Sequence, residues 1–215
     1  VFLHVSSDDL RIKKAKLPSV SQYKSKVRRL VRYFRALGVR EFGTWNEANH
    51  ASQPTAGAPA RAADFFDVVR AACRACTVVA GDVLDQAGME RYLVRYRAAL
   101  DSRPAVWGLH NYADTNRFRR GGLRALLRSV DGQVWLTETG GLYRFSRNFP
   151  PSQRRQAQAV AYTFRVARSS PRVKRVYLYN WTGAARGARF DAGLVGPDGR
   201  PRRAYEVLRR ALDVG

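Results

Sequence analysis

The sequence predicts an α/β fold of the (β/α)8-barrel type, in one domain over residues 1–215 and incomplete. Short apolar segments alternate with helical ones, which indicates parallel strands joined by right-handed crossovers. Polar side chains follow nearly every strand, as in a barrel whose loops all face one site. The Gly-x-Gly-x-x-Gly turn that is usual in an open doubly wound sheet does not occur. About six strand–helix units are expected, whereas a complete barrel has eight.

The predicted strands are short segments rich in Val, Leu, Phe, Trp and Tyr. The segment Ser7–Val20 is basic and irregular, and we expect no strand in it. The six strands are expected at Val1–Ser6, Arg40–Trp45, Thr77–Val83, Ala105–Tyr112, Gln133–Thr139 and Arg175–Trp181.

The predicted helices lie between these strands. Ser21–Leu37 has apolar residues at helical spacing, and Gly38 is a typical helix terminator. The other helices are expected at Ala60–Ala72, Met89–Ala99, Leu123–Ser129, Ser152–Ser169 and Pro201–Leu212. Pro104, Pro151 and Pro171 mark joints between elements.

The composition is that of a globular protein, with 45% hydrophobic residues and ten Phe, ten Tyr and four Trp. No apolar run approaches the ~20 residues that span a bilayer, so no membrane span is expected. The chain begins with Val and shows no basic-then-apolar leader. We therefore expect a processed or excerpted product.

The formal net charge is +22, and 33 of the basic residues are Arg. A strong positive charge can indicate binding to nucleic acid or another polyanion. Here the arginines are spread over many helices, with Arg28, Arg32 and Arg35 on one and Arg91 and Arg95 on another. We therefore expect a solvated basic surface and no nucleic-acid partner, with polyanion binding as the alternative.

The two cysteines, Cys73 and Cys76, lie between the end of a predicted helix and the start of a strand. A redox pair would stand at the start of a helix, and a metal site would need a second pair. We expect a short disulfide that closes the helix-to-strand turn, with two free thiols as the alternative. A disulfide would fit a secreted or extracytoplasmic protein.

Two glutamates stand at the ends of predicted strands. Glu47 follows Arg40–Trp45, and Glu138 lies at the end of Gln133–Thr139. In parallel α/β folds, chemistry takes place at the carboxyl ends of the strands. Two carboxylates there can act as general acid/base and nucleophile on a glycosidic bond. The pair therefore indicates an enzyme.

Four strand-end motifs together resemble those of clan A glycoside hydrolases, which are TIM barrels. They are Trp45-Asn46-Glu47, His110-Asn111-Tyr112, Trp135-Leu136-Thr137-Glu138 and Tyr179-Asn180-Trp181. The set looks most like family 39-type enzymes and actinobacterial glycosyl hydrolase catalytic core proteins. In that clan the two glutamates end the fourth and seventh barrel strands. Here they end the second and fifth predicted strands, so the resemblance implies that the first two barrel strands are missing.

The resemblance implies a retaining glycosidase. Glu47 would be the general acid/base and Glu138 the nucleophile, with the two carboxylates ~5–5.5 Å apart. Asn46 would contact the sugar 2-hydroxyl. The structural alternatives are a Glu47 that binds a surface arginine, a Glu138 that caps a turn, and an Asn46 that only forms a turn.

Three further strand-end residues are candidate substrate ligands. His110 and Tyr112 are two positions apart and are expected on one strand face, where Tyr112 would orient Glu138 and His110 would reach the substrate. Trp181 would form the apolar floor under the sugar ring. The alternatives are a buried His–Tyr pair without function and an ordinary core tryptophan.

Four weaker candidates remain. Asp82 and Asp85 follow a predicted strand and either bind sugar hydroxyls or cap the next helix. His4 lies within the first strand, where it contacts sugar or is a packed structural residue. His50 lies near Glu47 in a loop that would shape the acceptor side.

No metal site is predicted, because three scattered histidines and two cysteines form no ligand cluster. Retaining glycoside hydrolysis needs no cofactor, and the expected partner is an oligo- or polysaccharide substrate. The alternative function is a non-catalytic barrel remnant that binds carbohydrate or a polyanion. The missing units favour this alternative, because an incomplete barrel exposes strand edges. Such an edge could also support a homodimer.

Overall fold

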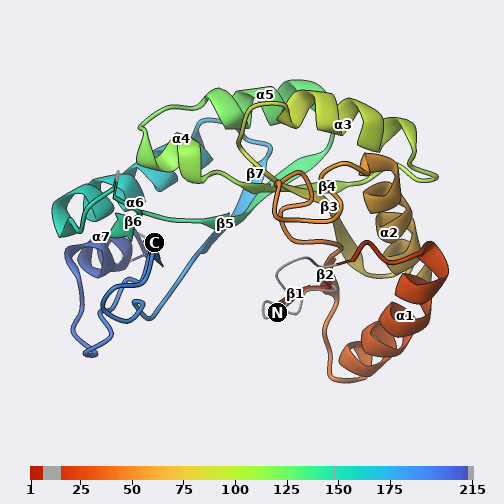
Figure 1. Ribbon diagram of the computed structural model, residues 1–215, viewed down its shortest axis with the longest axis horizontal. Helices are drawn as coiled ribbons and strands as arrows, with labels where there is room; N and C mark the ends of the chain where they lie inside the picture. The colour runs from red at the N-terminus through yellow and green to blue at the C-terminus, as the bar shows by residue number, and fades with distance from the viewer. Residues whose placement is uncertain (7–15, 148, 213–215) are drawn as a thin grey trace. The chain divides into compact units, whose positions relative to one another are not determined.

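The computed structural model describes residues 1–6, 16–147 and 149–212 (Figure 1). The chain forms two compact units. Unit 1 comprises Val1–His110 and Ala125–Trp135, and unit 2 comprises Asn111–Arg124 and Leu136–Gly215. Most of the segment predicted to lack a strand, residues 7–15, lies outside the described residues. No described helix combines the length and the apolar character that crossing a bilayer requires.

The main sheet has six strands in the order β1-β2-β3-β4-β5-β7. Their spatial order is their order along the chain, whereas a doubly wound sheet reverses direction at a switch point. This is the strand order of an incomplete (β/α)8 barrel, as predicted. All six predicted strands are confirmed, at Phe2–His4 (β1), Glu41–Gly43 (β2), Thr77–Leu84 (β3), Val106–His110 (β4), Gln133–Thr139 (β5) and Val173–Leu178 (β7).

Strands β1 to β4 pair in parallel register within unit 1. His4 lies opposite Gly43, Gly43 lies opposite Val79, and Val79 lies opposite Val106. The register of β3 against β4 shifts between Ala80 and Val83, which indicates a β-bulge. Strand β4 is buried along its whole length, as expected of a strand inside a parallel sheet.

Helices α1 (Val20–Ala36), α2 (Pro59–Ala72) and α3 (Met89–Ala98) connect the strands of unit 1, and α2 packs against both of the others (Figure 1). Ser19 begins α1 with a capping box. The buried hydroxyl of Tyr23 on this helix donates to the carbonyls of Val5 and Thr44. Burial raises the pKa of this tyrosine. Tyr23 therefore ties α1 to the segments that follow β1 and β2.

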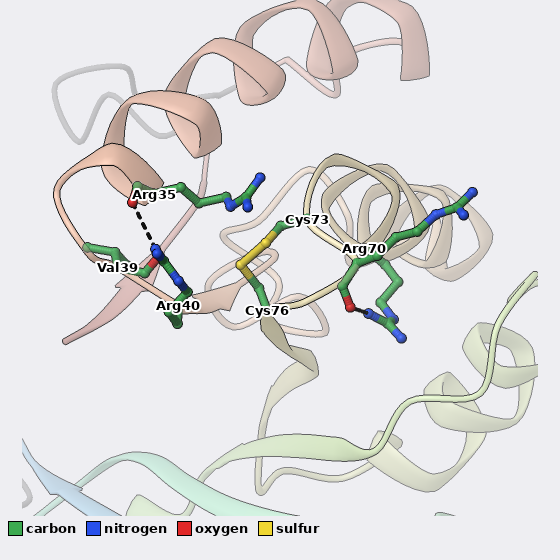
Figure 2. Close-up of a disulfide and its surroundings, with 7 residues drawn as sticks. Arg35, Val39, Arg40, Arg70, Cys73 and Cys76 are labelled. Atoms are coloured by element: carbon green, nitrogen blue, oxygen red, sulfur yellow. Dashed lines mark hydrogen bonds between the residues drawn. A yellow bond between two sulfur atoms is a disulfide. The ribbon is translucent and has the colours of Figure 1, made fainter.

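The predicted disulfide is present between Cys73 and Cys76, whose Cα atoms are 5.3 Å apart (Figure 2). Cys73 is the C-cap of α2, and β3 begins directly after Cys76. Both sulfurs are buried with their residues. The bridge therefore closes the turn that leads from α2 into β3.

Unit 2 is built on helices α6 (Gln153–Arg168) and α7 (Arg203–Leu212), which pack side by side (Figure 1). Val160, Leu194 and Ala204 form the centre of this packing. Helix α5 (Gly121–Ser129) begins in unit 2 and ends in unit 1. All six predicted helices are thus confirmed, with ends that differ by one or two residues.

Three short elements were not predicted. Helix α4 is Tyr112–Asn116, and an antiparallel pair is formed by β6 (Arg144–Phe145) and β8 (Phe190–Asp191). The prediction that Tyr112 continues the strand of His110 is therefore wrong, because β4 ends at His110. Elements of two to five residues carry too few positions to show a periodicity.

A buried ion pair joins the end of β8 to the residue before α7. Both oxygens of Asp191 accept from the Arg202 guanidinium, at 2.9 and 2.8 Å, and Oδ1 also accepts from the Gly193 N–H. Burial opposes ionisation of Asp191, but these hydrogen bonds outweigh it and lower the pKa of the carboxyl group.

Replacing Asp191 with Asn should lower the free energy of unfolding by about 3–5 kcal/mol near neutral pH, because a buried guanidinium loses its carboxylate. The folded pKa of Asp191 is depressed, so its stabilisation is present above the unfolded value of about 3.9 and is lost as pH falls through the folded value. Urea denaturation of the wild type and of Asp191→Asn at neutral pH measures the loss of unfolding free energy. The same comparison at strongly acidic pH measures how much of that loss disappears.

The matched control is Asp198→Asn, which breaks an exposed pair with Arg200. It should change the unfolding free energy by less than about 0.5 kcal/mol. A loss for Asp191→Asn that is equally small, or independent of pH, would contradict the role given to the buried pair.

Candidate active site

Glu47 lies in the turn that follows β2, in unit 1. Its backbone has a φ of 45°, which is uncommon for a residue other than glycine. The side chain is about one-fifth exposed, and its Oε1 lies 3.3 Å from Nδ1 of His110. Nδ1 of His50 lies 3.9 Å from Oε2, so His50 is near Glu47 as predicted. Among the described residues, the ion pairs of Glu47 are with two histidines and not with an arginine.

The segment before Glu47 is anchored in the core. The Trp45 ring is buried and stacks on Phe65 at 5.1 Å, and its Nε1 donates to Gln53. Asn46 is half-buried between Trp45 and Glu47. Its predicted contact with a sugar hydroxyl stays a prediction.

Asp82 occupies the bulge of β3 and does not follow the strand. Its φ is 47° and that of Gly81 is 79°, while β3 continues to Leu84. The side chain is buried and contacts His4 Nε2, and its Oδ1 lies 3.7 Å from Nε2 of His110. The rings of His4 and His110 are nearly parallel, with an interplanar angle of 7° and centroids 6.1 Å apart. The prediction that the histidines are scattered is therefore wrong for these two.

The N-cap of α3 is Gly88, so neither Asp82 nor Asp85 is the N-cap residue of that helix. Asp85 is buried, and its N–H donates to the His110 carbonyl at 3.1 Å. Whether either carboxylate binds sugar stays a prediction.

Glu138 lies near the end of β5, in unit 2. The hydroxyl of Tyr112 donates to its Oε1 at 2.9 Å, so the predicted contact between these residues is present. The hydroxyl comes from the first residue of α4 and not from a strand. The next residue, Thr139, accepts a hydrogen bond from the N–H of Tyr179, which holds the end of β5 to the segment after β7.

Asn116 fixes the position of α4, a role that was not predicted. Its amide nitrogen donates to the carbonyls of Tyr112 and Gly140, and its oxygen accepts from the N–H of Leu142. The residue is buried. Asn116 therefore joins the helix that carries Tyr112 to the turn that follows Glu138, and no local pattern in the sequence indicates this.

Aromatic rings gather in unit 2. Trp181 is 59% exposed and packs edge-on against Tyr205, so the alternative of a core tryptophan is wrong. Phe190 lies at 5.7 Å from Tyr112 and 6.1 Å from Tyr179, measured between ring centroids. Phe190 was not among the predicted site residues, and the only local signal is that it precedes a glycine-rich segment.

Comparisons with known proteins find solved structures of similar fold. No protein-family model and no curated protein matches the chain. A GH39 β-xylosidase from Caulobacter crescentus is similar over 97% of this chain and 52% of its own, at a TM-score of 0.70 and 16% identity. The GH39 enzyme from Xanthomonas axonopodis pv. citri is similar over 92% of this chain and 46% of its own, at a TM-score of 0.65 and 14% identity. Xylanase 10B from Thermotoga maritima is similar over 90% of this chain and 66% of its own, at a TM-score of 0.61 and 14% identity.

The chain shares its fold with these glycoside hydrolase structures. The resemblance that the strand-end motifs predicted is therefore confirmed at the level of the fold. The chain spans about half the length of the two GH39 structures. Identities near 15% do not carry an activity from those proteins to this chain.

Gly43 on β2 leaves the space that His4 occupies. A Cβ at this position would collide with the His4 imidazole and lie 2.9 Å from Cζ of Phe2. Gly43→Ala should lower the free energy of unfolding by about 1–3 kcal/mol, because a methyl group there overpacks a filled space. Urea denaturation measures the change.

Gly57→Ala is the matched control, since a Cβ at that glycine meets no atom within 4 Å. It should be neutral or slightly stabilising. Equal stabilities of the two variants would show that the space beside His4 is not filled.

Proposed function

We propose that the protein is a retaining glycoside hydrolase in which Glu47 is the general acid/base and Glu138 the nucleophile. The observation that carries the proposal is the hydrogen bond from Tyr112 to Glu138 at the end of β5. A strand-end carboxylate held by a tyrosine hydroxyl is oriented for attack, and the fold is shared with glycosidases. Glu47 stands three strands away in sheet order, after β2, which is the spacing expected of the pair.

In the proposed reaction, Glu138 attacks the anomeric carbon while Glu47 protonates the leaving oxygen. Glu47 then removes a proton from the water that hydrolyses the glycosyl-enzyme intermediate. The proposal requires carboxylates ~5–5.5 Å apart, since a separation of ~6.5–9.5 Å gives inversion. The His110 imidazole, 3.3 Å from Glu47, would hold the acid/base in position.

The remaining strand-end residues would bind the sugar. Asn46 would contact the 2-hydroxyl, and Trp181, exposed in unit 2, would provide the apolar floor. His4, His110 and Asp82 would reach other hydroxyls. The hydrolase needs no cofactor.

The substrate would be an oligo- or polysaccharide. Two of the similar structures are named β-xylosidase and xylanase, so xylosides are the first substrates to test. The disulfide fits an oxidising compartment, and we place the protein outside the cytoplasm in this proposal.

The second candidate function is a non-catalytic barrel remnant that binds carbohydrate or a polyanion. It is favoured by the six-strand sheet, in which β1 is an edge strand of three residues, and by the net charge of +22. Polyanion binding should fall steeply with ionic strength, whereas hydrolysis of a neutral glycoside should not. Dimerisation through the β1 edge would appear in light scattering, and a monomer at high concentration would exclude it.

The catalytic proposal is tested on a panel of aryl xylosides, glucosides, arabinosides, galactosides and mannosides. Glu138→Gln should abolish turnover, and Glu47→Gln should lower kcat/KM by about 10²–10⁴-fold for substrates that need protonation. Glu206→Gln, at an exposed pair on α7, is the control and should retain full activity. Activity that survives Glu138→Gln would refute the proposal, and no turnover by a well-folded protein would favour the binding function.

Tyr112→Phe removes one hydrogen bond to Glu138 and keeps the ring. Because a hydrogen bond to a charged group contributes about 1.5–3 kcal/mol, kcat/KM should fall about 10–100-fold. Steady-state kinetics on the best aryl glycoside measures the loss. An unchanged kcat/KM would mean that the hydroxyl does not orient the nucleophile.

A further inference from the structure

Three side chains from different strands of unit 1 bring metal-ligating atoms together. His4 ends β1, Asp82 occupies the bulge of β3, and His110 ends β4. One ligand atom of each lies within 4.8 Å of the other two. The contacts are His4 Nε2 with Asp82 Oδ2 and His110 Nε2 with Asp82 Oδ1, so the carboxylate stands between two imidazoles.

The backbone is shaped to make this cluster. The bulge at Gly81 and Asp82, with φ of 79° and 47°, turns the Asp82 side chain toward both histidines. Gly43, opposite His4 in the parallel register, lacks the Cβ that would push the His4 ring away. Both features are local departures from regular strand structure, and both serve the same three side chains.

The distance between His110 and Asp82 is compatible with two ligands on one ion. Nε2 and Oδ1 are 3.7 Å apart, beyond the range of an N–H···O bond. Two ligands bound at about 2.0–2.1 Å on a tetrahedral ion are themselves about 3.3 Å apart. Nε2 of His4 is buried and makes no hydrogen bond, although it contacts Asp82.

The other nitrogen of His110 has the partner that a metal-bound histidine needs. Its Nδ1 lies 3.3 Å from Glu47 Oε1. Oε1 can accept from an Nδ1–H, and in that tautomer the lone pair of His110 is on Nε2. Such a carboxylate behind a histidine fixes the tautomer and orients the ring in metal sites.

We infer that His4 Nε2, the Asp82 carboxylate and His110 Nε2 bind one divalent transition-metal ion of the zinc class. Two imidazoles and a carboxylate suit Zn²⁺, Co²⁺ or Ni²⁺ and leave a fourth position for water. Asp82 and His110 are buried, whereas the His4 side chain is 26% exposed, so the ion enters beside His4. Bound there, it ties the short edge strand β1 to β3 and β4. This inference does not depend on the proposed glycosidase activity, and it replaces the sugar contacts proposed above for these three side chains.

The chain has so few histidines and cysteines that each candidate metal ligand of these types can be tested by substitution. It has three histidines, and the third, His50, is outside the cluster. Its two cysteines form the disulfide, so no free thiol competes for metal. Untagged, chelator-treated protein of residues 1–215 is titrated with zinc chloride by calorimetry and with Co²⁺ by visible absorption.

One Zn²⁺ per chain should bind to the wild type and to His50→Asn. His4→Asn, Asp82→Asn and His110→Asn should lose the site, and Glu47→Gln should bind about tenfold more weakly. Zn²⁺ should also raise the Tm of the wild type and of His50→Asn, but not of His4→Asn. No binding to the wild type, or binding by His4→Asn and His110→Asn that is as tight as that of the wild type, would overturn the site.

X-ray absorption of the Zn²⁺-loaded wild type keeps the inference testable if a variant fails to fold. Two imidazole ligands and one or two oxygen ligands are expected. A spectrum with fewer than two imidazoles would overturn the assignment. These readouts use no sugar, so a failed glycosidase assay and a failed metal site are separate results.

Discussion

Parallel hydrogen bonding between successive strands is the constraint on which the rest of this structure depends. It requires a helical crossover after each strand and places the carboxyl end of every strand at one edge of the sheet. The order β1-β2-β3-β4-β5-β7 satisfies this rule with consecutive crossovers. The positions of three residues follow from it, because Glu47 comes after β2, His110 ends β4 and Glu138 stands near the end of β5.

The two glutamates are positioned by different kinds of structure. Glu47 is backed by a rigid core in which Trp45 stacks on Phe65, and its carboxylate contacts His110. Glu138 depends on Tyr112, which sits on a helix of five residues. Asn116 joins that helix to the turn after Glu138 by hydrogen bonds to Gly140 and Leu142, and Thr115 joins it to Thr139.

Sequence reasoning found the elements that carry a periodic pattern and missed those that do not. The bounds of β5, Gln133–Thr139, match the prediction because an apolar run there ends at a polar residue and two glycines. Tyr112 was placed on a strand because α4 is too short to show a helical period. The cluster of His4, Asp82 and His110 could not be foreseen, because it needs a register shift in β3 that leaves no signal beyond one glycine.

The central claim is that Glu138 forms a covalent bond to the sugar, and mechanism-based labelling tests it most directly. The protein would be incubated with 2,4-dinitrophenyl 2-deoxy-2-fluoro glycosides of xylose, glucose and galactose, digested with trypsin and analysed by mass spectrometry. Glu138 lies in the fragment 129–144 and Glu47 in the fragment 41–61, so the two carboxylates are separated by the digestion. The account predicts a glycosyl adduct on Glu138 in fragment 129–144. An adduct on fragment 41–61, or no adduct with any sugar on folded protein, would contradict it.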